Sequence, residues 1–235
     1  MVERNKTFQV VVHGIMVLLC LVCVLPFLLL IMSSVADENW LIMNGYSFFP
    51  AKLSADAYQY LLVDSSSIVR GYLISAFVTV AGTCISLVMT TLMAYPLSRK
   101  DLPGRYIFSF FIFFTMLFNG GLVPTYIMWT QTFHIKNTIF ALLVPNLLMG
   151  AFYVIMMRTY FSSNIPDAVI EAARIDGAGE MRILLKIVLP MSLPIIATLA
   201  LLTGLVYWND WLNGLYYIQN DSLYSIQVLL SLIHI

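Results

Sequence analysis

The most informative part of this sequence reads Glu171-Ala172-Ala173-Arg174-Ile175-Asp176-Gly177 and, after nine further residues, Ile187-Val188-Leu189-Pro190. It is a charged, helix-favouring segment with a glycine stop, placed between two apolar stretches. Glutamate and alanine suit an exposed helix, and Gly177 can provide the turn that ends it. Asn164 or Asp167 can cap the start of this helix, and Pro166 suits its first turn. We therefore predict a short helix that lies across the face of an apolar protein and fits into a groove on a partner.

The composition places the chain in a membrane. Hydrophobic residues make up 60% and charged residues 10% of the sequence, and the mean hydropathy is +0.89. A soluble domain carries about 25% charged residues, so this chain falls well outside that class. The formal net charge is zero, so nothing indicates nucleic acid as a partner. Membrane lipid is the expected surrounding of most of the chain.

Five apolar stretches are long enough to cross a bilayer, which takes roughly 20 residues each. We predict an all-α integral membrane protein with spans over residues 11–32, 71–97, 106–129, 138–157 and 187–208. The first stretch also has features of a signal peptide, because basic residues precede it and small residues follow it. A signal peptide core has about 7–15 apolar residues, so a retained span is the favoured interpretation.

Basic residues predict the orientation, because they are more frequent on the cytoplasmic side of a membrane. With the N-terminus in the cytoplasm, only Lys52, Arg70 and Lys136 lie outside, and the other Lys and Arg residues lie inside. The segment that begins at Glu171 then faces the cytoplasm. We divide the chain into residues 1–70, with the first span and the first extracytoplasmic segment, and residues 71–235. A short helix is expected near residues 55–62.

The segment that begins at Glu171 resembles the loop signature of binding-protein-dependent ABC importer permeases, E-A-A-x3-G-x9-I-x-L-P. The fixed positions are all present, as Glu171, Ala172, Ala173, Gly177, Ile187, Leu189 and Pro190. The resemblance implies that these residues and Asp176 couple a type I ABC importer transmembrane domain to ATPase subunits. It also implies the partners: a second permease subunit, two cytoplasmic ATPase subunits and an extracytoplasmic sugar-binding protein. The implied location is the bacterial cytoplasmic membrane.

Members of this family usually have a sixth span that ends in the cytoplasm. Residues 221–228 resemble the loop that follows the fifth span in the family, and the sequence stops soon afterwards, at Ile235. We therefore expect the domain over residues 71–235 to be incomplete at its C-terminus, with five spans of an expected six.

The sequence shows no arrangement of residues for catalysis. It has no glycine-rich phosphate loop that ends in Gly-Lys-Ser/Thr and no H-E-x-x-H zinc motif. His13, His134 and His234 are isolated, and Cys20 and Cys23 lack further ligands for a metal. We expect no metal, no cofactor and no enzymatic activity, with ATP hydrolysis left to separate subunits.

Two interruptions of the apolar spans are candidates for a translocation pathway, because transporters often place their sites at broken helices. Asn119, Gly120, Gly121 and Pro124 interrupt the third predicted span, and Pro145-Asn146 interrupts the fourth. The two spans run in opposite directions, and a rise of about 1.5 Å per residue puts both breaks at similar depth. The alternative is that both breaks are packing kinks.

The end of the fifth predicted span carries an aromatic and polar group, Trp208, Asn209, Asp210 and Trp211. Aromatic faces stack on sugar rings, and Asn and Asp bond hydroxyl groups; the alternative is an aromatic belt at the membrane–water interface. This group and residues 118–126 also resemble a branch of carbohydrate permeases associated with oligosaccharides. The predicted function is therefore an ABC importer subunit that translocates a sugar or oligosaccharide. The alternatives are a membrane scaffold that retains the loop, or an amino-acid or peptide ABC permease.

Overall fold

The computed structural model describes residues 6–63 and 65–233 of the chain. Arg4, which contributed to the predicted orientation, and the final residues His234 and Ile235 lie outside the described residues. The chain divides into two compact units, Met1–Ser65 and Ser66–Ile235, which are described separately. This division is close to the predicted boundary between residues 70 and 71.

The first unit is built around one long apolar helix, α1 (Lys6–Ser34). Its 29 residues are enough to cross a bilayer, and its large apolar side chains are exposed within the chain, as expected of a helix whose neighbours are lipid or another subunit. Two short helices follow, α2 (Glu38–Asn44) and α3 (Asp56–Val63). The Asp37 side chain caps α2 by accepting a hydrogen bond of 2.9 Å from the backbone N–H of Trp40. Helices are present where we expected the span over 11–32 and the helix near 55–62.

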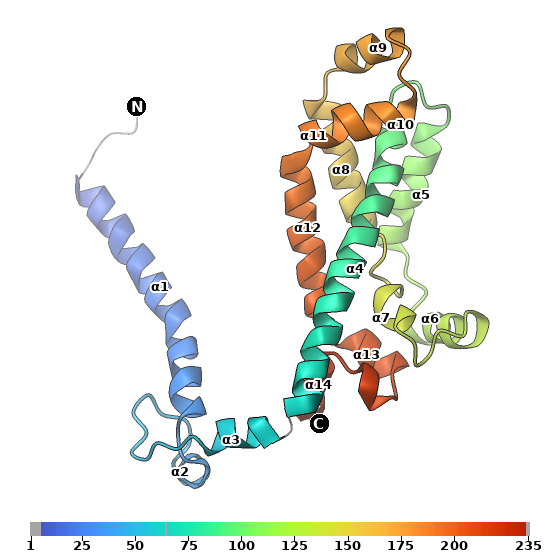
Figure 1. Ribbon diagram of the computed structural model, residues 1–235. Coiled ribbons are helices and arrows are strands. Elements are labelled where there is room, and N and C mark those ends of the chain that lie inside the picture. The colour runs from blue at the N-terminus through green and yellow to red at the C-terminus, as the bar shows by residue number, and fades with distance from the viewer. Residues whose placement is uncertain (1–5, 64, 234–235) are drawn as a thin grey trace. The chain divides into compact units, whose positions relative to one another are not determined.

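Helices joined by turns and loops make up the described part of the second unit (Figure 1). Its α-helices are α4 (Ser65–Ser98), α5 (Arg105–Leu117), α6 (Leu122–Ile127), α7 (Phe140–Leu143), α8 (Ala151–Asn164), α9 (Asp167–Ile175), α10 (Glu180–Ile183), α11 (Leu189–Met191), α12 (Leu193–Trp208), α13 (Leu212–Tyr217) and α14 (Ile226–Ile233). Two π-helical turns, η1 (Met128–Thr132) and η2 (Leu184–Val188), and the 3-10 turn η3 (Asp221–Leu223) complete it.

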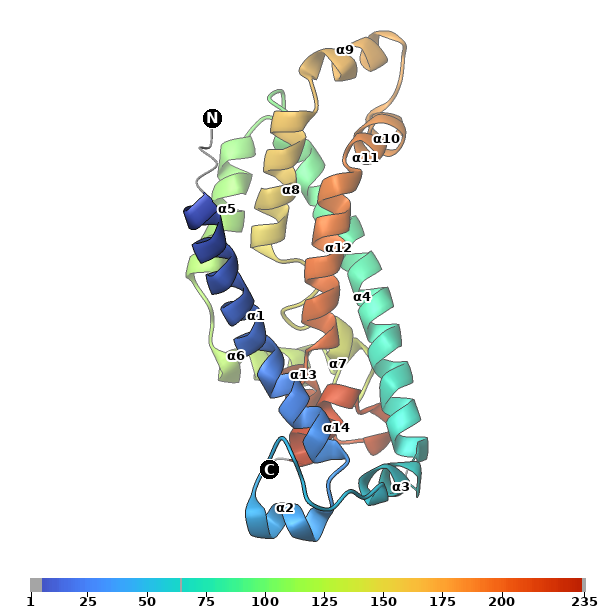
Figure 2. The same ribbon diagram turned by 90° about the vertical axis from the view of Figure 1, so that its left-hand side faces the viewer.

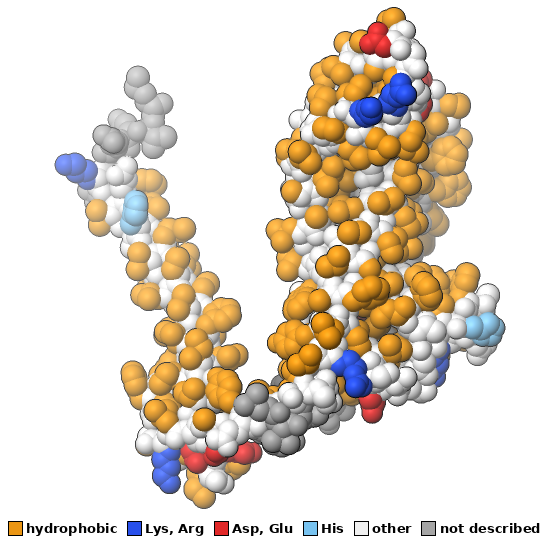
Figure 3. All heavy atoms as spheres, viewed as in Figure 1, with side chains coloured by type: hydrophobic (Ala, Val, Ile, Leu, Met, Phe, Trp, Pro, Cys, Tyr) orange, Lys and Arg blue, Asp and Glu red, His pale blue; other side chains and the backbone are white. Residues whose placement is uncertain are grey.

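Four helices, α4, α5, α8 and α12, form the bundle of this unit (Figures 1 and 2). Its core is apolar and includes the fully buried side chains of Met157, Phe161, Ile183 and Leu199. Helix α9 projects at one end of the bundle, and α6, α7, α13 and α14 lie at the opposite end. We call these the α9 end and the α13 end. In the view of Figure 3, apolar side chains cover the bundle between the two ends, and charged side chains gather at the ends.

The third predicted span is broken where the sequence indicated. Helix α5 ends at Leu117, α6 begins at Leu122, and the chain turns by 111° between them. Gly121 has a φ of +84°, a left-handed conformation that glycine adopts without steric cost. Gly121 therefore allows the chain to turn here.

The fourth predicted span is interrupted around Pro145-Asn146, as the sequence indicated, and the fifth differs from the expected continuous helix. Residues 144–150 separate α7 from α8, and α8 runs on to Asn164 rather than ending near residue 157. The fifth stretch bends by 82° between Glu180–Met191 and Leu193–Trp208. The physical reason is Pro194, which has no N–H to donate and whose ring clashes with the carbonyl four residues earlier. Only α12 therefore remains as the straight part of this span.

Within the described part of the chain, two helices can cross a membrane by length and composition, or up to four if each bent pair is one span. The bent pairs are α5 with α6 and η1, and α10 to α11 with α12. The number of five spans stays a prediction, while the all-α membrane fold is confirmed.

Candidate functional site

Helix α9 is amphipathic and carries the loop signature at the end of the bundle. Ile170 and Ala173 are 2% and 8% exposed and pack into the core, whereas Glu171, Ala172 and Asp176 are exposed. The resemblance implied a coupling role for Ala173, but its side chain is buried, because Ala173 lies three residues from Ile170 and so shares its inward face.

The end of α9 is a Schellman turn centred on Gly177. The Gly177 N–H donates to the carbonyl of Arg174 at 3.0 Å, and the Ala178 N–H donates to the carbonyl of Ala173 at 2.9 Å. Gly177 has a φ of +77°, which is the left-handed conformation this motif requires. The predicted glycine stop is therefore confirmed.

The start of α9 differs from the predicted cap. Pro166 occupies the N-cap position, and no side chain caps the helix there. The Asn164 amide donates instead to the carbonyl of Tyr160 at 3.2 Å, within α8. The Asp167 carboxylate lies 2.7 Å from Lys100 Nζ, and this ion pair holds the pKa of Asp167 below its ordinary value. Asp167 thus ties α9 to the loop after α4 rather than capping its own helix.

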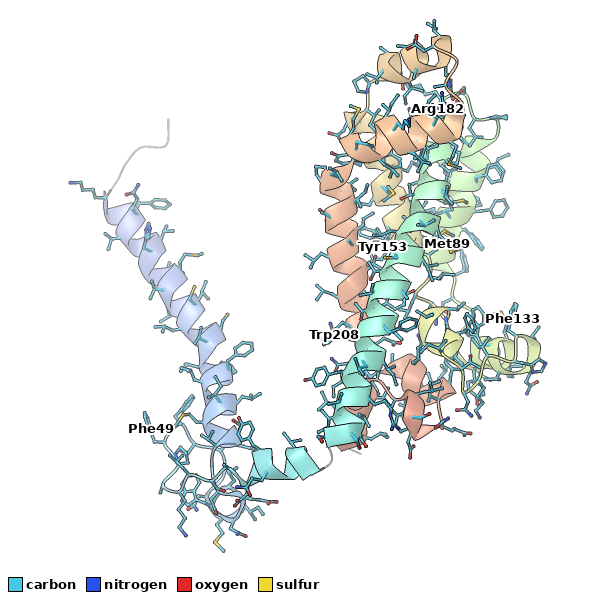
Figure 4. All side chains as sticks on the ribbon, in the orientation of Figure 1. Phe49, Met89, Phe133, Tyr153, Arg182 and Trp208 are labelled. Carbon is cyan, nitrogen blue, oxygen red and sulfur yellow. The ribbon has the colours of Figure 1, made fainter. Side chains whose placement is uncertain are left out.

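The remaining signature residues, Ile187, Leu189 and Pro190, lie in η2 and α11. Ile187 and Leu189 are half-buried and pack against the apolar core, while Pro190 is exposed. Ile187 and Leu189 therefore help to anchor the segment after α9 in the core. They do not belong to the exposed surface of α9 itself. Figure 4 labels Arg182, which lies in α10 at the same end of the bundle.

Four polar side chains join α9, α10 and the end of α4, and we call them the Glu180 cluster: Tyr95, Asp101, Arg174 and Glu180. The Tyr95 hydroxyl donates to Glu180 Oε2 at 2.6 Å, and Arg174 Nε donates to Glu180 Oε1 at 2.7 Å. Arg174 Nη1 also lies 2.8 Å from Asp101 Oδ2. The hydrogen bonds from Tyr95 and Arg174 lower the pKa of the Glu180 carboxyl. Sequence reasoning missed this cluster, and its one signal was the opposite charges of Arg174 and Glu180 on either side of the Gly177 turn.

At the α13 end, three interrupted segments line an open pocket of about 380 Å³ with both polar and apolar side chains, which we call the polar pocket. The segments are the break between α5 and α6, the loop between α7 and α8, and the turn between α12 and α13. The lining residues are Asn119, Gly121, Leu122, Thr125, Pro145, Asn146, Leu147, Asp210, Leu212, Asn213, Tyr216 and Tyr217. The two predicted breaks therefore meet in one pocket, together with Asp210.

Side chains from α12 and α13 satisfy the backbone carbonyls that the broken fourth segment leaves free. Asn213 Nδ2 donates to the carbonyl of Pro145 at 3.0 Å, and the Tyr207 hydroxyl donates to the carbonyl of Leu143 at 2.9 Å. Unpaired carbonyls inside a bilayer cost several kcal/mol each, so these bonds are what permits irregular backbone here. Asn146 has a φ of +61°, an uncommon conformation for a residue with a side chain.

Several residues predicted for the pathway do not line this pocket: Gly120, Pro124, Trp208, Asn209 and Trp211. The Asn209 amide donates to the carbonyl of Leu205 in its own helix at 2.8 Å. The ring of Trp208 lies 6.4 Å from that of Tyr72, and Figure 4 shows Trp208 on α12. Of the aromatic and polar group at the end of α12, only Asp210 reaches the pocket.

The pocket also contains residues that sequence reasoning did not assign to a pathway, among them Thr125, Asn213, Tyr216 and Tyr217. Tyr217 stacks on Tyr126, with ring centroids 5.6 Å apart and an angle of 11° between the planes. Asn213 lies three residues after Asp210, and that spacing on one turn was the available signal. Among the described residues, no group of three His, Cys, Asp or Glu is placed to hold a metal ion.

Residues 67–227 match the family described as the binding-protein-dependent transport system inner membrane component. This match covers most of the chain, and the chain belongs to that family, the permease components of ABC importers. It is a transport component rather than a catalytic subunit, and its family works in complexes with other subunits. The recognition from the loop signature and the predicted permease function are therefore confirmed, and the alternative scaffold and amino-acid or peptide readings are not favoured.

Individual relatives agree with this assignment. The chain is 38% identical over 227 residues to the polygalacturonan/rhamnogalacturonan transport system permease protein YtcP of Bacillus subtilis, covering 97% of this chain and 78% of the relative. It is 26% identical to the arabinooligosaccharides transport system permease protein AraQ of Halalkalibacterium halodurans, covering 88% and 75%. A crystal structure of a bacterial ABC transporter involved in the import of the acidic polysaccharide alginate matches with a TM-score of 0.86 and 29% identity, covering 98% of this chain and 81% of that one.

Proposed function

We propose that this chain forms part of the pathway by which an ATP-driven importer moves an oligosaccharide across the bacterial cytoplasmic membrane. The observation that carries the proposal is the polar pocket in which three interrupted segments meet. Irregular backbone at membrane depth is tolerated only where it is buried in protein or lines a water-filled cavity, and transporters place their substrate sites there.

The chemistry of the pocket suits a sugar. Amide groups of Asn119, Asn146 and Asn213 can both donate to and accept from hydroxyl groups. The carboxylate of Asp210 accepts from hydroxyls, and the rings of Tyr216 and Tyr217 offer apolar faces. Because a pyranose ring presents hydroxyls at its edge and C–H groups on its faces, this combination matches both.

The proposed substrate class is an oligomer of sugar residues rather than a monosaccharide. The relatives named above carry polygalacturonan or rhamnogalacturonan, arabino-oligosaccharides and alginate in their names, and all of these are oligomeric or polymeric carbohydrates. Neither Lys nor Arg is present among the described residues that line the pocket. The lining residues therefore suit recognition of hydroxyl groups.

The α9 end is proposed to face the cytoplasm and to bind an ATPase subunit. The bias of basic residues supports this orientation, with the N-terminus also inside. The exposed residues Glu171, Ala172, Asp176 and Gly177 would then enter a groove on the ATPase. We further propose two ATPase subunits, a second permease chain that completes the pathway and an extracytoplasmic binding protein that delivers the sugar.

The test is uptake by cells that express the complete transport system. Radiolabelled oligosaccharides of neutral and of acidic sugars would be supplied, with monosaccharides, amino acids and a dipeptide as controls. The proposal expects uptake of at least one oligosaccharide and none of the amino acid or dipeptide. Uptake of the dipeptide alone would overturn the substrate class, and co-purification of this chain without any ATPase would overturn the coupling role.

A further inference from the structure

The Glu180 cluster connects α9 to the bundle through polar side chains. In it, each oxygen of the Glu180 carboxylate accepts a hydrogen bond from a different helix. Glu180 Oε1 accepts from Arg174, on α9, and Glu180 Oε2 accepts from Tyr95, on α4. The bond lengths of 2.7 and 2.6 Å are those of charge-assisted hydrogen bonds. One side chain on α10 thus holds two other helices in fixed relation.

We propose that Tyr95 and Glu180 are positioning residues that convert a displacement of α9 into a displacement of α4, and that α4 carries this displacement to the polar pocket. The proposal rests on the proposed function, in which α9 binds the ATPase. It adds a route between the two ends of the bundle that the loop signature does not contain.

Helix α4 is suited to this role because it reaches from the cluster to the contacts around the pocket. It is an unbroken helix between Gly82 and Tyr95, and the distance along its axis is about 20 Å. Pro96 lies beyond Tyr95, in the last turn, so it does not interrupt this part. Rigid secondary elements of this kind can carry coupling between two sites.

At Gly82, about 20 Å from Tyr95, α4 contacts Tyr207, whose hydroxyl group bonds the backbone next to the pocket. A Cβ atom on Gly82 would lie 2.5 Å from the ring of Tyr207, so the helices have no free space between them at this point. The Tyr207 hydroxyl donates to the carbonyl of Leu143, two residues before the pocket residue Pro145. A shift of α4 must therefore displace Tyr207 and the loop between α7 and α8.

The neighbouring ion pair between Lys100 and Asp167 is not expected to transmit force. Its side chains are 78% and 53% exposed, and such pairs contribute little because water and salt screen them. The side chains of Arg174 and Glu180 are also 37% and 53% exposed, so the same screening weakens their ion pair. The cluster differs from the Lys100–Asp167 pair through Tyr95, which is buried and has the guanidinium of Arg99 5.3 Å from the centre of its ring. Removing Tyr95 or Lys100 therefore compares the effects of a buried and an exposed connection between α9 and α4.

The test uses the complete transport complex in membrane vesicles and a cysteine in place of Asn146, in a background with Cys20, Cys23 and Cys84 replaced by alanine. The rate of reaction with a small polar thiol reagent is measured with and without ATP. Tyr95→Phe removes one hydroxyl group and keeps the ring. We expect it to reduce the ATP-dependent change in reactivity about fivefold or more, while the ATPase still co-purifies. Glu180→Gln should have a similar effect, and the double variant should add little to either.

Lys100→Ala is the matched control and should leave the response to ATP unchanged. An unchanged response in Tyr95→Phe, or fully additive effects of Tyr95→Phe and Glu180→Gln, would overturn this inference while leaving the proposed function intact. If the background with wild-type Tyr95 shows no response to ATP and no bound ATPase, the proposed function fails, and this inference falls with it.

Discussion

At the scale of single residues, the two ends of the bundle depend on the conformation of one glycine and on the direction of a few polar side chains. Gly177 ends α9 in the left-handed conformation, and Asn119, Asn146 and Asp210 reach a common pocket. Roles that depend on side-chain direction were harder to predict, because Ala173 faces inward and Asn209 bonds its own helix. The Glu180 cluster was not predicted, since its members come from three separate segments.

The conformation of Gly177 makes a prediction about the end of α9. Gly177→Ala should destabilise the turn by about 1–2 kcal/mol, because a Cβ atom is disfavoured at a φ of +77°. Gly179→Ala is the control, since Gly179 has a φ of −72° and both sites have open space for a Cβ. Hydrogen exchange over residues 171–178 measures the difference. Equal exchange rates in the two variants would show that the turn does not depend on glycine.

The Glu180 cluster makes a prediction about pH. The pKa of Glu180 is lowered in the folded chain, so the stabilisation it gives is complete above the ordinary carboxyl pKa of about 4.3 and is lost as the pH falls below it. The contribution of Glu180 to the thermal stability of the purified chain should therefore be present and independent of pH between about pH 5 and 7. Below that range, the wild type should lose more stability than Glu180→Gln. An equal loss of thermal stability at low pH in the wild type and in Glu180→Gln would mean that the cluster does not stabilise the fold.

At the scale of helices, composition predicted where the apolar stretches lie, and glycine and proline determined where they break or bend. The long helices α1 and α4 cover their predicted spans, and the prolines inside them, Pro26 in α1 and Pro96 in the last turn of α4, do not end them. The break before α6 was predicted from its glycines. The bend before α12 was not, because Pro194 lies in an apolar run that otherwise satisfies the pattern of a span.

The contact between α4 and α12 makes a prediction at this scale. Gly82→Ala should destabilise the fold by about 1–3 kcal/mol, because the new Cβ would lie 2.5 Å from the Tyr207 ring. Gly204→Ala is the matched control, since its Cβ would lie at an ordinary 3.5 Å from the Thr83 hydroxyl. Both glycines are inside helices, so both variants gain the same helix propensity. Thermal unfolding in detergent measures the difference, and equal stability of both variants would contradict the close packing.

At the scale of the whole molecule, the second unit has two chemically different ends joined by an apolar bundle. An exposed charged helix lies at one end and a polar pocket at the other, while the sides carry the apolar surface that lipid or another subunit covers (Figure 3). This separation fits a permease, in which energy is supplied at one end and substrate is held at another. The sequence predicted both ends from local motifs. It did not predict their connection, which depends on contacts such as that of Glu180 with Tyr95.

The central claim, that three interrupted segments form a sugar pathway, is tested most directly by thiol reactivity in the complete complex. Cysteine is placed in turn at Asn119, Asn146 and Asp210, with Asn209 as the neighbouring control that does not line the pocket. The account predicts that a small polar reagent modifies all three pocket positions, and that a saturating oligosaccharide substrate slows the modification there but not at Asn209. If the three positions stay unreactive in every nucleotide state, or if the substrate protects none of them, the pocket is a packing feature and the claim is wrong.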